Sequence, residues 1–133
     1  MNQTDIDLAV REAVCEALAL ADDEATPDAT LTDELGAESI DLLDVLFRIE
    51  RSTGVKIHAA DLAEHIQGGL ADDEFSDDGE IVTEAGLAHL KSIMPQIDPA
   101  GLQGNLTAER VIDLFSVQNL ADLVAQRAAL ASA

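Results

Sequence analysis

The chain is short of several residue types, and each shortage excludes a class of structure. It has a single cysteine, Cys15, in 133 residues, which excludes an internal disulfide and a multi-cysteine metal site. It has no tryptophan, no tyrosine and three phenylalanines, so its core must consist of aliphatic side chains. Its seven lysines and arginines stand against 27 aspartates and glutamates, giving a net charge of −20. This charge argues against nucleic acids and anionic membranes as partners, because both require basic residues.

The sequence also lacks a long hydrophobic run and a signal segment. No apolar stretch approaches the roughly 20 residues that span a bilayer. Residues Met1 to Asp5 contain no basic segment followed by an apolar one, so no secretory signal is expected. We therefore expect a soluble, cytoplasmic protein, a monomer, with all 133 residues in a single domain.

Helical periodicity is the main pattern that the sequence contains. Apolar residues recur at three- and four-residue spacing, as amphipathic helices require. Residues 21–35 and the acidic residues 67–80 lack this pattern and are expected to be loops. The predicted fold is an all-α bundle whose helices cover residues 4–20 with Thr4 as N-cap, 39–52, 59–66, 84–94 with Thr83 as N-cap, a short segment near 111–115, and 117–130 with Ser116 as N-cap.

The helix expected at residues 39–52 is unusually apolar. Its few charged residues share one narrow stripe, so the rest of its surface must be covered by other helices or must line a cavity that an apolar group can enter. Asp44 and Arg48 are four residues apart and are predicted to form an ion pair. The stripe consists of Asp41, Asp44, Arg48 and Arg51.

A serine stands where this helix begins. Gly36 breaks the chain before it, and Ser39 lies close to the first backbone N–H groups of the helix, which favour a phosphate. If Ser39 were only an N-cap, its capping box would require Glu or Gln where Leu42 stands. A cap would also leave unexplained the acids around the serine, which are Glu38, Asp41 and Asp44.

The stretch Leu35-Gly36-Ala37-Glu38-Ser39-Ile40-Asp41 resembles the attachment motif of the acyl carrier proteins, a Gly-x-Asp-Ser-Leu-type turn that opens their second helix. Here Glu replaces Asp and Ile replaces Leu. Residues 53–57 and 115–124 resemble the family's link into its third helix and the start of its last helix. The resemblance implies an acyl-carrier-protein-like four-helix bundle that is a carrier and not an enzyme, with 4′-phosphopantetheine on Ser39 holding acyl groups as thioesters.

The resemblance also implies partners. A phosphopantetheinyl transferase would modify Ser39, and acyl-transferring or condensing enzymes with basic docking surfaces would then use the carrier in fatty-acid, lipid A or polyketide biosynthesis. Residues 39–50 look closer to specialised bacterial carriers, including those for very long acyl chains in lipid A synthesis. The expected docking residues are Glu38, Asp41 and Asp44. The expected lining of an acyl pocket is Ile40, Leu43, Leu46, Phe47 and Ile57, each of which could equally be ordinary core.

Two features depart from the family pattern. Arg48 and Arg51 lie on a helix face that is almost purely acidic in the family, which could exclude the general fatty-acid synthases by like-charge repulsion. An insertion at about residues 67–114 precedes the last helix, so the resemblance covers residues 4–66 and 115–128. The insertion is expected to extend the bundle with additional helices. It either has no role of its own, or covers the acyl pocket, or forms a docking surface.

Three other functions remain open from the sequence. A calcium loop would place Glu74, Ser76, Asp78 and Gly79 at its first, third, fifth and sixth positions, but Ala85 stands where the bidentate Glu is required, and no metal site is expected. A serine hydrolase would require a Gly-x-Ser-x-Gly elbow, which the Ser39 motif does not match. An unmodified, carrier-like acidic interaction protein would keep the fold while Ser39 stays bare.

Overall fold

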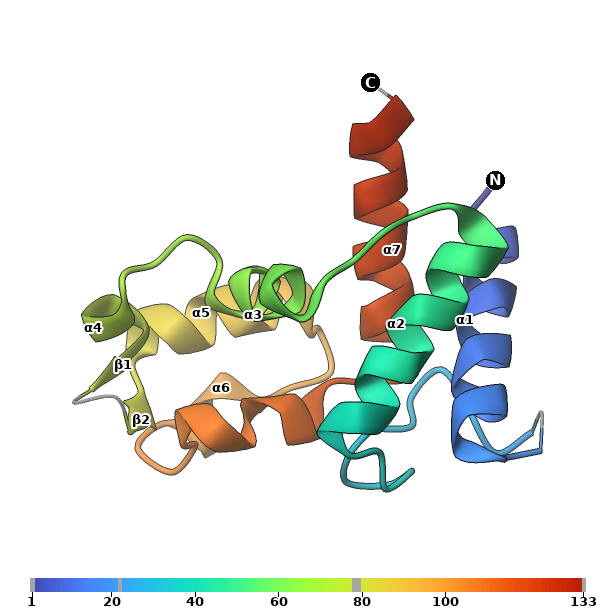
Figure 1. The fold of residues 1–133 in the computed structure, drawn as a ribbon. Coiled ribbons are helices and arrows are strands. Elements are labelled where there is room, and N and C mark those ends of the chain that lie inside the picture. Colours follow the sequence, from blue (N-terminus) through green and yellow to red (C-terminus); the bar gives the residue numbers. More distant parts are fainter. Residues whose placement is uncertain (1, 22, 78–79, 133) are drawn as a thin grey trace.

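The computed structural model describes residues 2–21, 23–77 and 80–132 (Figure 1). The chain is mostly helical, which confirms the all-α prediction, and it adds one short hairpin in which Ser76 pairs with Val82 and Asp77 with Ile81. The helices are α1 (Gln3–Leu18), α2 (Ser39–Thr53), α3 (Ala59–Gln67), α4 (Asp72–Phe75), α5 (Glu84–Ile93), α6 (Pro99–Leu102), the 3-10 helix η1 (Ala108–Leu114) and α7 (Val117–Ser132), and the strands are β1 (Ser76–Asp77) and β2 (Ile81–Val82).

Helices α1, α2 and α7 form one group, in which α1 packs against both of the others (Figure 1). Each helix buries residues at three- or four-residue spacing, as the periodicity predicts. These inward residues are Val10 and Val14 of α1, Val45 and Ile49 of α2, and Leu120 and Val124 of α7. Helix α1 begins one residue earlier than expected and its N-cap is Asn2, so the assignment of Thr4 was wrong. Asn2 Oδ1 accepts from the Asp5 N–H at 2.9 Å, and Asp5 completes the capping box.

The remaining helices form a second group around α5, which contacts α3, α4 and α6. Residues 67–80, expected to be a loop, instead contain α4 and β1. Phe75 is buried in the core and its carbonyl accepts from the Thr83 N–H at 2.9 Å, which holds this acidic segment against the start of α5. Thr83 also caps α5 as predicted, since its hydroxyl accepts from the Gly86 N–H at 3.1 Å.

Buried polar contacts join the two groups at the start of α7. The Ser116 N–H donates to Asn119 Oδ1 at 2.9 Å and the Asn119 N–H donates to Ser116 Oγ at 3.1 Å, so Ser116 caps α7 as predicted. The Asn119 amide also donates to the Ile93 carbonyl at 3.2 Å. Gln96 Nε2 donates to Asn119 Oδ1 at 2.6 Å. Asn119 therefore fastens the segment after α5 to α7.

Helix α3 packs on the insertion. His89 of α5 contacts the His65 carbonyl through Nε2 at 2.9 Å, and its ring lies against Gly68, whose left-handed backbone (φ 69°) ends α3. The Arg127 guanidinium of α7 pairs with Asp61 at 2.9 Å. The backbone N–H of His58 and the charge of Arg127 together hold the pKa of Asp61 below its ordinary value. Helix α3 is thus tied to both α5 and α7.

We expect the protein to lose stability as the pH falls below about 6.5. Burial lowers the pKa of His65 below its ordinary 6.5, and the charges of His89 and Arg127 lower it further, while Asp122 acts in the opposite direction. The unfolded chain therefore binds a proton at a higher pH than the folded chain does. The contribution of His65 to stability is complete above about pH 6.5 and is lost as the pH falls through the window below it.

Thermal unfolding between about pH 7.5 and pH 5.5 measures this loss. The His65→Gln variant should show a shallower pH dependence than the wild type. The matched control is His58→Gln, because His58 is exposed at the start of α3. An equal pH dependence in the wild type and in His65→Gln would contradict the prediction.

Candidate functional site

Ser39 is the first residue of α2, in the turn that leads from the long first loop into the helix. Gly36 adopts a left-handed conformation (φ 74°), which glycine tolerates and most residues do not. Ala37 is buried, and its N–H donates to the Leu31 carbonyl at 2.9 Å. The Ser39 side chain lies outside the described part of the structure, but its neighbours Glu38 and Ile40 are both exposed. The turn is therefore anchored on one side and open on the other.

The end of the insertion and the residue after it accept hydrogen bonds from the loop that leads to this turn. The Leu31 N–H donates to the Phe115 carbonyl at 3.0 Å, and Thr32 Oγ1 donates to Asp113 Oδ1 at 2.7 Å. Phe115 directly follows η1, and Asp113 belongs to η1, which is the last part of the insertion. The loop before Ser39 is thus hydrogen-bonded to a segment that is distant in sequence.

The N-cap of α2 is Glu38, so Ser39 is not simply a capping residue. The Asp41 carboxylate accepts from the Glu38 N–H at 2.9 Å, which closes the first turn. Asp41 also stands in the first turn, where a negative charge stabilises the helix dipole. One of the three acids around Ser39 thus has a structural role that the sequence analysis did not assign to it.

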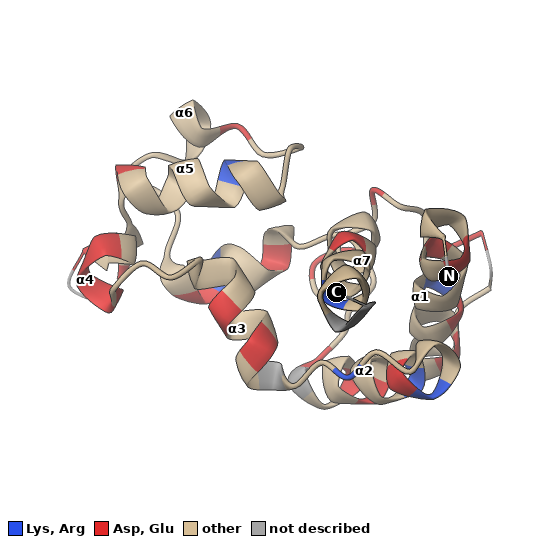
Figure 2. Cartoon of the chain, turned by 90° about the horizontal axis from the view of Figure 1, so that it is seen from above, with Lys and Arg blue, Asp and Glu red and all other residues tan. Residues whose placement is uncertain are grey.

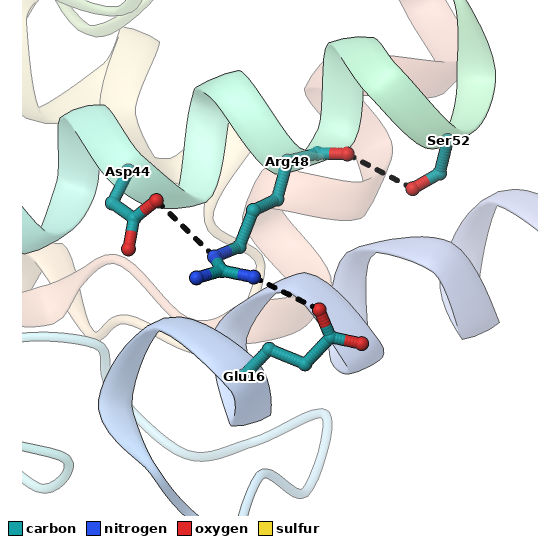
Figure 3. Close-up of polar contacts among 4 residues, drawn as sticks. All are labelled: Glu16, Asp44, Arg48 and Ser52. Carbon is teal, nitrogen blue, oxygen red and sulfur yellow. Dashed lines mark hydrogen bonds and ion pairs between the residues drawn. The ribbon is translucent and has the colours of Figure 1, made fainter.

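Asp44 is engaged in a network that crosses between two helices (Figure 3). Arg48 Nε donates to Asp44 Oδ1 at 3.1 Å, which confirms the predicted ion pair, and the guanidinium also pairs with Glu16 of α1 at 3.0 Å. The Ser52 hydroxyl donates to the Arg48 carbonyl at 2.9 Å. Arg48, one of the two departures from the family pattern, therefore fastens α2 to α1.

The five residues expected to line an acyl pocket are not brought together. Leu46 and Ile57 are buried in the core at 5% exposure each. The other three lie on the outer face of α2, at 71% exposure for Ile40, 53% for Leu43 and 56% for Phe47. These three side chains are therefore exposed in this structure, and their assignment to an acyl pocket stays a prediction. We call Ile40, Leu43 and Phe47 the apolar stripe.

Arg51 lies next to the apolar stripe, near the C-terminal end of α2. Its guanidinium carbon lies 5.8 Å from the centre of the Phe47 ring, within the range of a cation–π contact. Because exposed apolar side chains at i, i+3 and i+7 form one continuous surface on a helix, the stripe starts next to Ser39 and ends at a cation. A surface of this kind is typical of a protein interaction site.

The geometry of the described residues gives little support to calcium binding or serine hydrolysis. Two of the residues assigned to a calcium loop, Asp78 and Gly79, lie outside the described residues. Glu74 accepts from the Ala71 N–H at 3.0 Å within α4, and among the described residues no cluster of acidic, histidine or cysteine side chains is suited to a metal ion. His89 of α5 contacts the backbone carbonyl of His65 on α3, and the His65 ring lies against Phe115, so neither ring orients a nucleophile on α2. Within residues 2–21, 23–77 and 80–132, no helix is long and apolar enough to cross a bilayer.

Comparison with known proteins identifies what the first half of the chain is similar to. Residues 9–67 match the family described as "Phosphopantetheine attachment site". The chain is similar to the acyl carrier protein of Thermotoga maritima, with 40% identity over 53 residues, which are 40% of this chain and 65% of that protein. It is 38% identical over 58 residues to the acyl carrier protein of Solidesulfovibrio magneticus, covering 44% of this chain and 73% of the relative.

A further relative is the acyl carrier protein AcpXL of Brucella melitensis, with 30% identity over 60 residues, which are 45% of this chain and 64% of that protein. The chain spans slightly less than two thirds of some relatives, with 65% of the Thermotoga maritima protein and 62% of the Petrotoga mobilis protein matched. No solved structure matches the chain significantly. The matched family region ends at residue 67.

Proposed function

The chain belongs to the acyl carrier protein family, and from this premise we propose that it carries acyl groups as thioesters on a 4′-phosphopantetheine arm attached to Ser39. The observation that carries the proposal is the position of Ser39. It is the first residue of a 15-residue helix, on an anchored turn whose flanking residues are exposed. We further propose that residues 1–133 work as one carrier domain, because buried residues of both helix groups form one continuous core. We also propose that the carrier works in the cytoplasm and as a monomer.

The residues at the start of α2 suit a phosphodiester. The first N–H groups of a helix have no partner within the helix and carry a partial positive charge, which favours a phosphate. The Ser39 oxygen would form a bond to the coenzyme A phosphorus that bears the pantetheine. The bond between this phosphorus and the oxygen of adenosine 3′,5′-bisphosphate would break, and the transferase would accept the hydroxyl proton. The arm then supplies a thiol that holds the acyl group, and the chain positions it.

We propose that basic partner enzymes dock on α2 through its acids and the apolar stripe. Glu38 is the most exposed of the three expected docking acids, because Asp41 closes the helix turn and Asp44 pairs with Arg48. Acidic residues also lie along α3, the next helix in the chain, and the whole chain has a net charge of −20, so a basic partner meets a negative field (Figure 2). Such a field mainly increases the encounter rate with a basic partner. The apolar stripe would supply the buried contact once the partner is in place.

Reversing the charge of Glu38 should slow modification by a phosphopantetheinyl transferase. We expect Glu38→Lys to lower kcat/KM by roughly tenfold at low salt, with the difference from wild type shrinking as salt rises. The matched control is Asp23→Lys, which makes the same change in net charge on the exposed first loop. Equal rates for the two variants would mean that the whole-molecule charge, and not a docking surface on α2, determines the rate.

The experiment that tests the proposed function is the intact mass of the protein after incubation with coenzyme A, Mg²⁺ and a broad-specificity phosphopantetheinyl transferase. The gain of one phosphopantetheine would support a carrier. No gain with several transferases, on a folded helical sample, would overturn the proposal and favour the unmodified, carrier-like interaction protein. The mass spectrum after incubation with a series of acyl donors would then separate fatty-acid, lipid A and polyketide assembly.

A further inference from the structure

A groove of about 500 Å³ lies between α3 and η1, and the insertion forms most of its walls. Its apolar lining includes Ala63 and Ile66 of α3, Phe75 of α4, and Val111 and Ile112 of η1. Phe75 and Val111 are buried and form the floor, while Ile66 and Ile112 are half-buried and Ala63 is exposed. The volume lies within the range of about 300–1,000 Å³ that is typical of small-molecule sites.

Hydrogen bonds join the segments that line the groove. Gln67 Nε2 donates to Asp72 Oδ1 at 2.8 Å and to the Leu70 carbonyl at 2.7 Å, which joins the end of α3 to α4. Ile112 also lines the groove, and its carbonyl accepts from Thr32 Oγ1 at 3.4 Å. Thr32 follows Leu31, and the Leu31 carbonyl accepts from the N–H of Ala37, two residues before Ser39. The groove is therefore connected at Ile112 to the attachment turn through a short series of direct contacts.

On the premise of the proposed function, we propose that this groove holds the acyl chain carried by the Ser39 arm, so that the insertion supplies the acyl site of this carrier. The inward side chains of α2, which include Val45, Leu46 and Ile49, are packed in the core, and the apolar stripe on its outer face is uncovered. The groove, in contrast, is concave, apolar and connected to the turn.

The charged side chains that line the groove favour an acyl thioester over a free acid. Asp72 and Glu109 line the groove, so a free fatty acid or another anion would meet two carboxylates of the same sign. An acyl thioester is uncharged and leaves these carboxylates in water while its chain lies on the apolar floor. The class of ligand that fits is an uncharged, tethered acyl chain, and not a free acid.

The test uses the full chain with methyl-labelled isoleucine, leucine and valine, loaded from acetyl- or palmitoyl-coenzyme A by a phosphopantetheinyl transferase. We expect the methyl resonances of Ile66, Val111 and Ile112 to shift between the acetyl and palmitoyl forms, while those of Val45 and Ile49 stay in place. The palmitoyl form should also have a higher Tm than the acetyl form. Shifts confined to Val45 and Ile49 would overturn the proposal. Methyl resonances and a Tm that do not depend on chain length would also overturn it, and would favour a groove that binds a partner protein.

Variants at the exposed Ala63 test the same groove without disturbing the core. Ala63→Trp fills it and Ala63→Lys places a charge in its wall, and both should abolish the increase of Tm with chain length. Ala88→Trp, at an exposed position of α5, is the matched control and should retain the increase. The mass spectrum of each sample reports attachment separately. Attachment without a groove response overturns this inference alone, whereas failure of attachment overturns the proposed function and this inference with it.

Discussion

We expect the Ser39→Ala variant to gain no mass on incubation with coenzyme A, Mg²⁺ and a phosphopantetheinyl transferase, whereas the wild type should gain one phosphopantetheine. The effect is complete because the substitution removes the oxygen that would form the phosphodiester. It should leave the fold intact. Glu38 occupies the N-cap position and Asp41 closes the turn, so the helix start does not depend on the serine, and alanine is a favourable residue at a helical position.

The matched control for this experiment is Ser52→Ala on the same helix. Ser52 is exposed, and its hydroxyl donates to the Arg48 carbonyl one turn earlier, so its removal should change neither stability nor modification measurably. Circular dichroism of all three proteins checks that the helices remain. A mass gain that persists in Ser39→Ala would place the attachment on another residue, and a gain lost equally in Ser52→Ala would point to a disturbed α2 and not to a missing nucleophile.

Phe115→Ala should destabilise the protein by about 3–5 kcal/mol, the cost typical of removing a buried phenylalanine. The Phe115 side chain is fully buried, directly after η1. Its ring meets the His65 ring edge to face, with 6.4 Å between centres, so it supports α3 as well as the start of α7. Because domains of this kind are stable by only about 5–15 kcal/mol, this loss would be a large part of the total.

The control for this prediction is Phe47→Ala, since Phe47 is exposed on α2 and removing it leaves no cavity. Its cost should be about 0.5 kcal/mol or less. Urea unfolding followed by circular dichroism gives both free energies. If the two variants lost similar stability, Phe115 would not be the central packing residue between the two helix groups. Loss of transferase rate in Phe47→Ala without loss of stability would support the apolar stripe as a docking surface.

The features that could be predicted from the sequence are those that depend on neighbouring residues. The periodicity of α1, α2, α5 and α7 is local, and the expected helices match the observed ones to within a few residues. The caps at Thr83 and Ser116 and the Asp44–Arg48 pair also depend on residues three or four positions apart. Such interactions form whenever the helix forms, so reading them requires no knowledge of the tertiary fold.

The features that were missed depend on distant residues. The hairpin in the acidic segment is held by Val82, whose N–H donates to the Leu106 carbonyl at 2.9 Å, and by a bridge between Ile81 and Thr107. The high charge of residues 67–80 concealed a buried apolar anchor, Phe75. Whether an apolar helix face is covered is also decided elsewhere in the chain. The exposure of the apolar stripe follows from the docking of α3 on α5, which the sequence of α2 does not encode.

Of the candidate site, the sequence predicted the serine at the helix start, the surrounding acids and the Asp44–Arg48 pair, but not that Asp41 closes the first turn of α2. Asp41 and Asp44 are both bound within α2, and only the three-dimensional arrangement reveals that Arg48 also reaches Glu16. The groove between α3 and η1 could not be predicted either, because its two walls are more than forty residues apart in sequence.

The packing of α1 against α7 has a consequence for how the chain folds during synthesis. These are the first and last helices of the described residues, and Asp7 and Gln118, 111 positions apart, come within 3.5 Å of each other. While the insertion is being translated, α1 and α2 have no third helix to cover their inward side chains. Closing the chain between α2 and α7 costs loop entropy, and this cost is smaller if residues 67–114 are already compact when α7 arrives. Folding should be slow for a helical protein of this size, and the incomplete chain should be prone to aggregation.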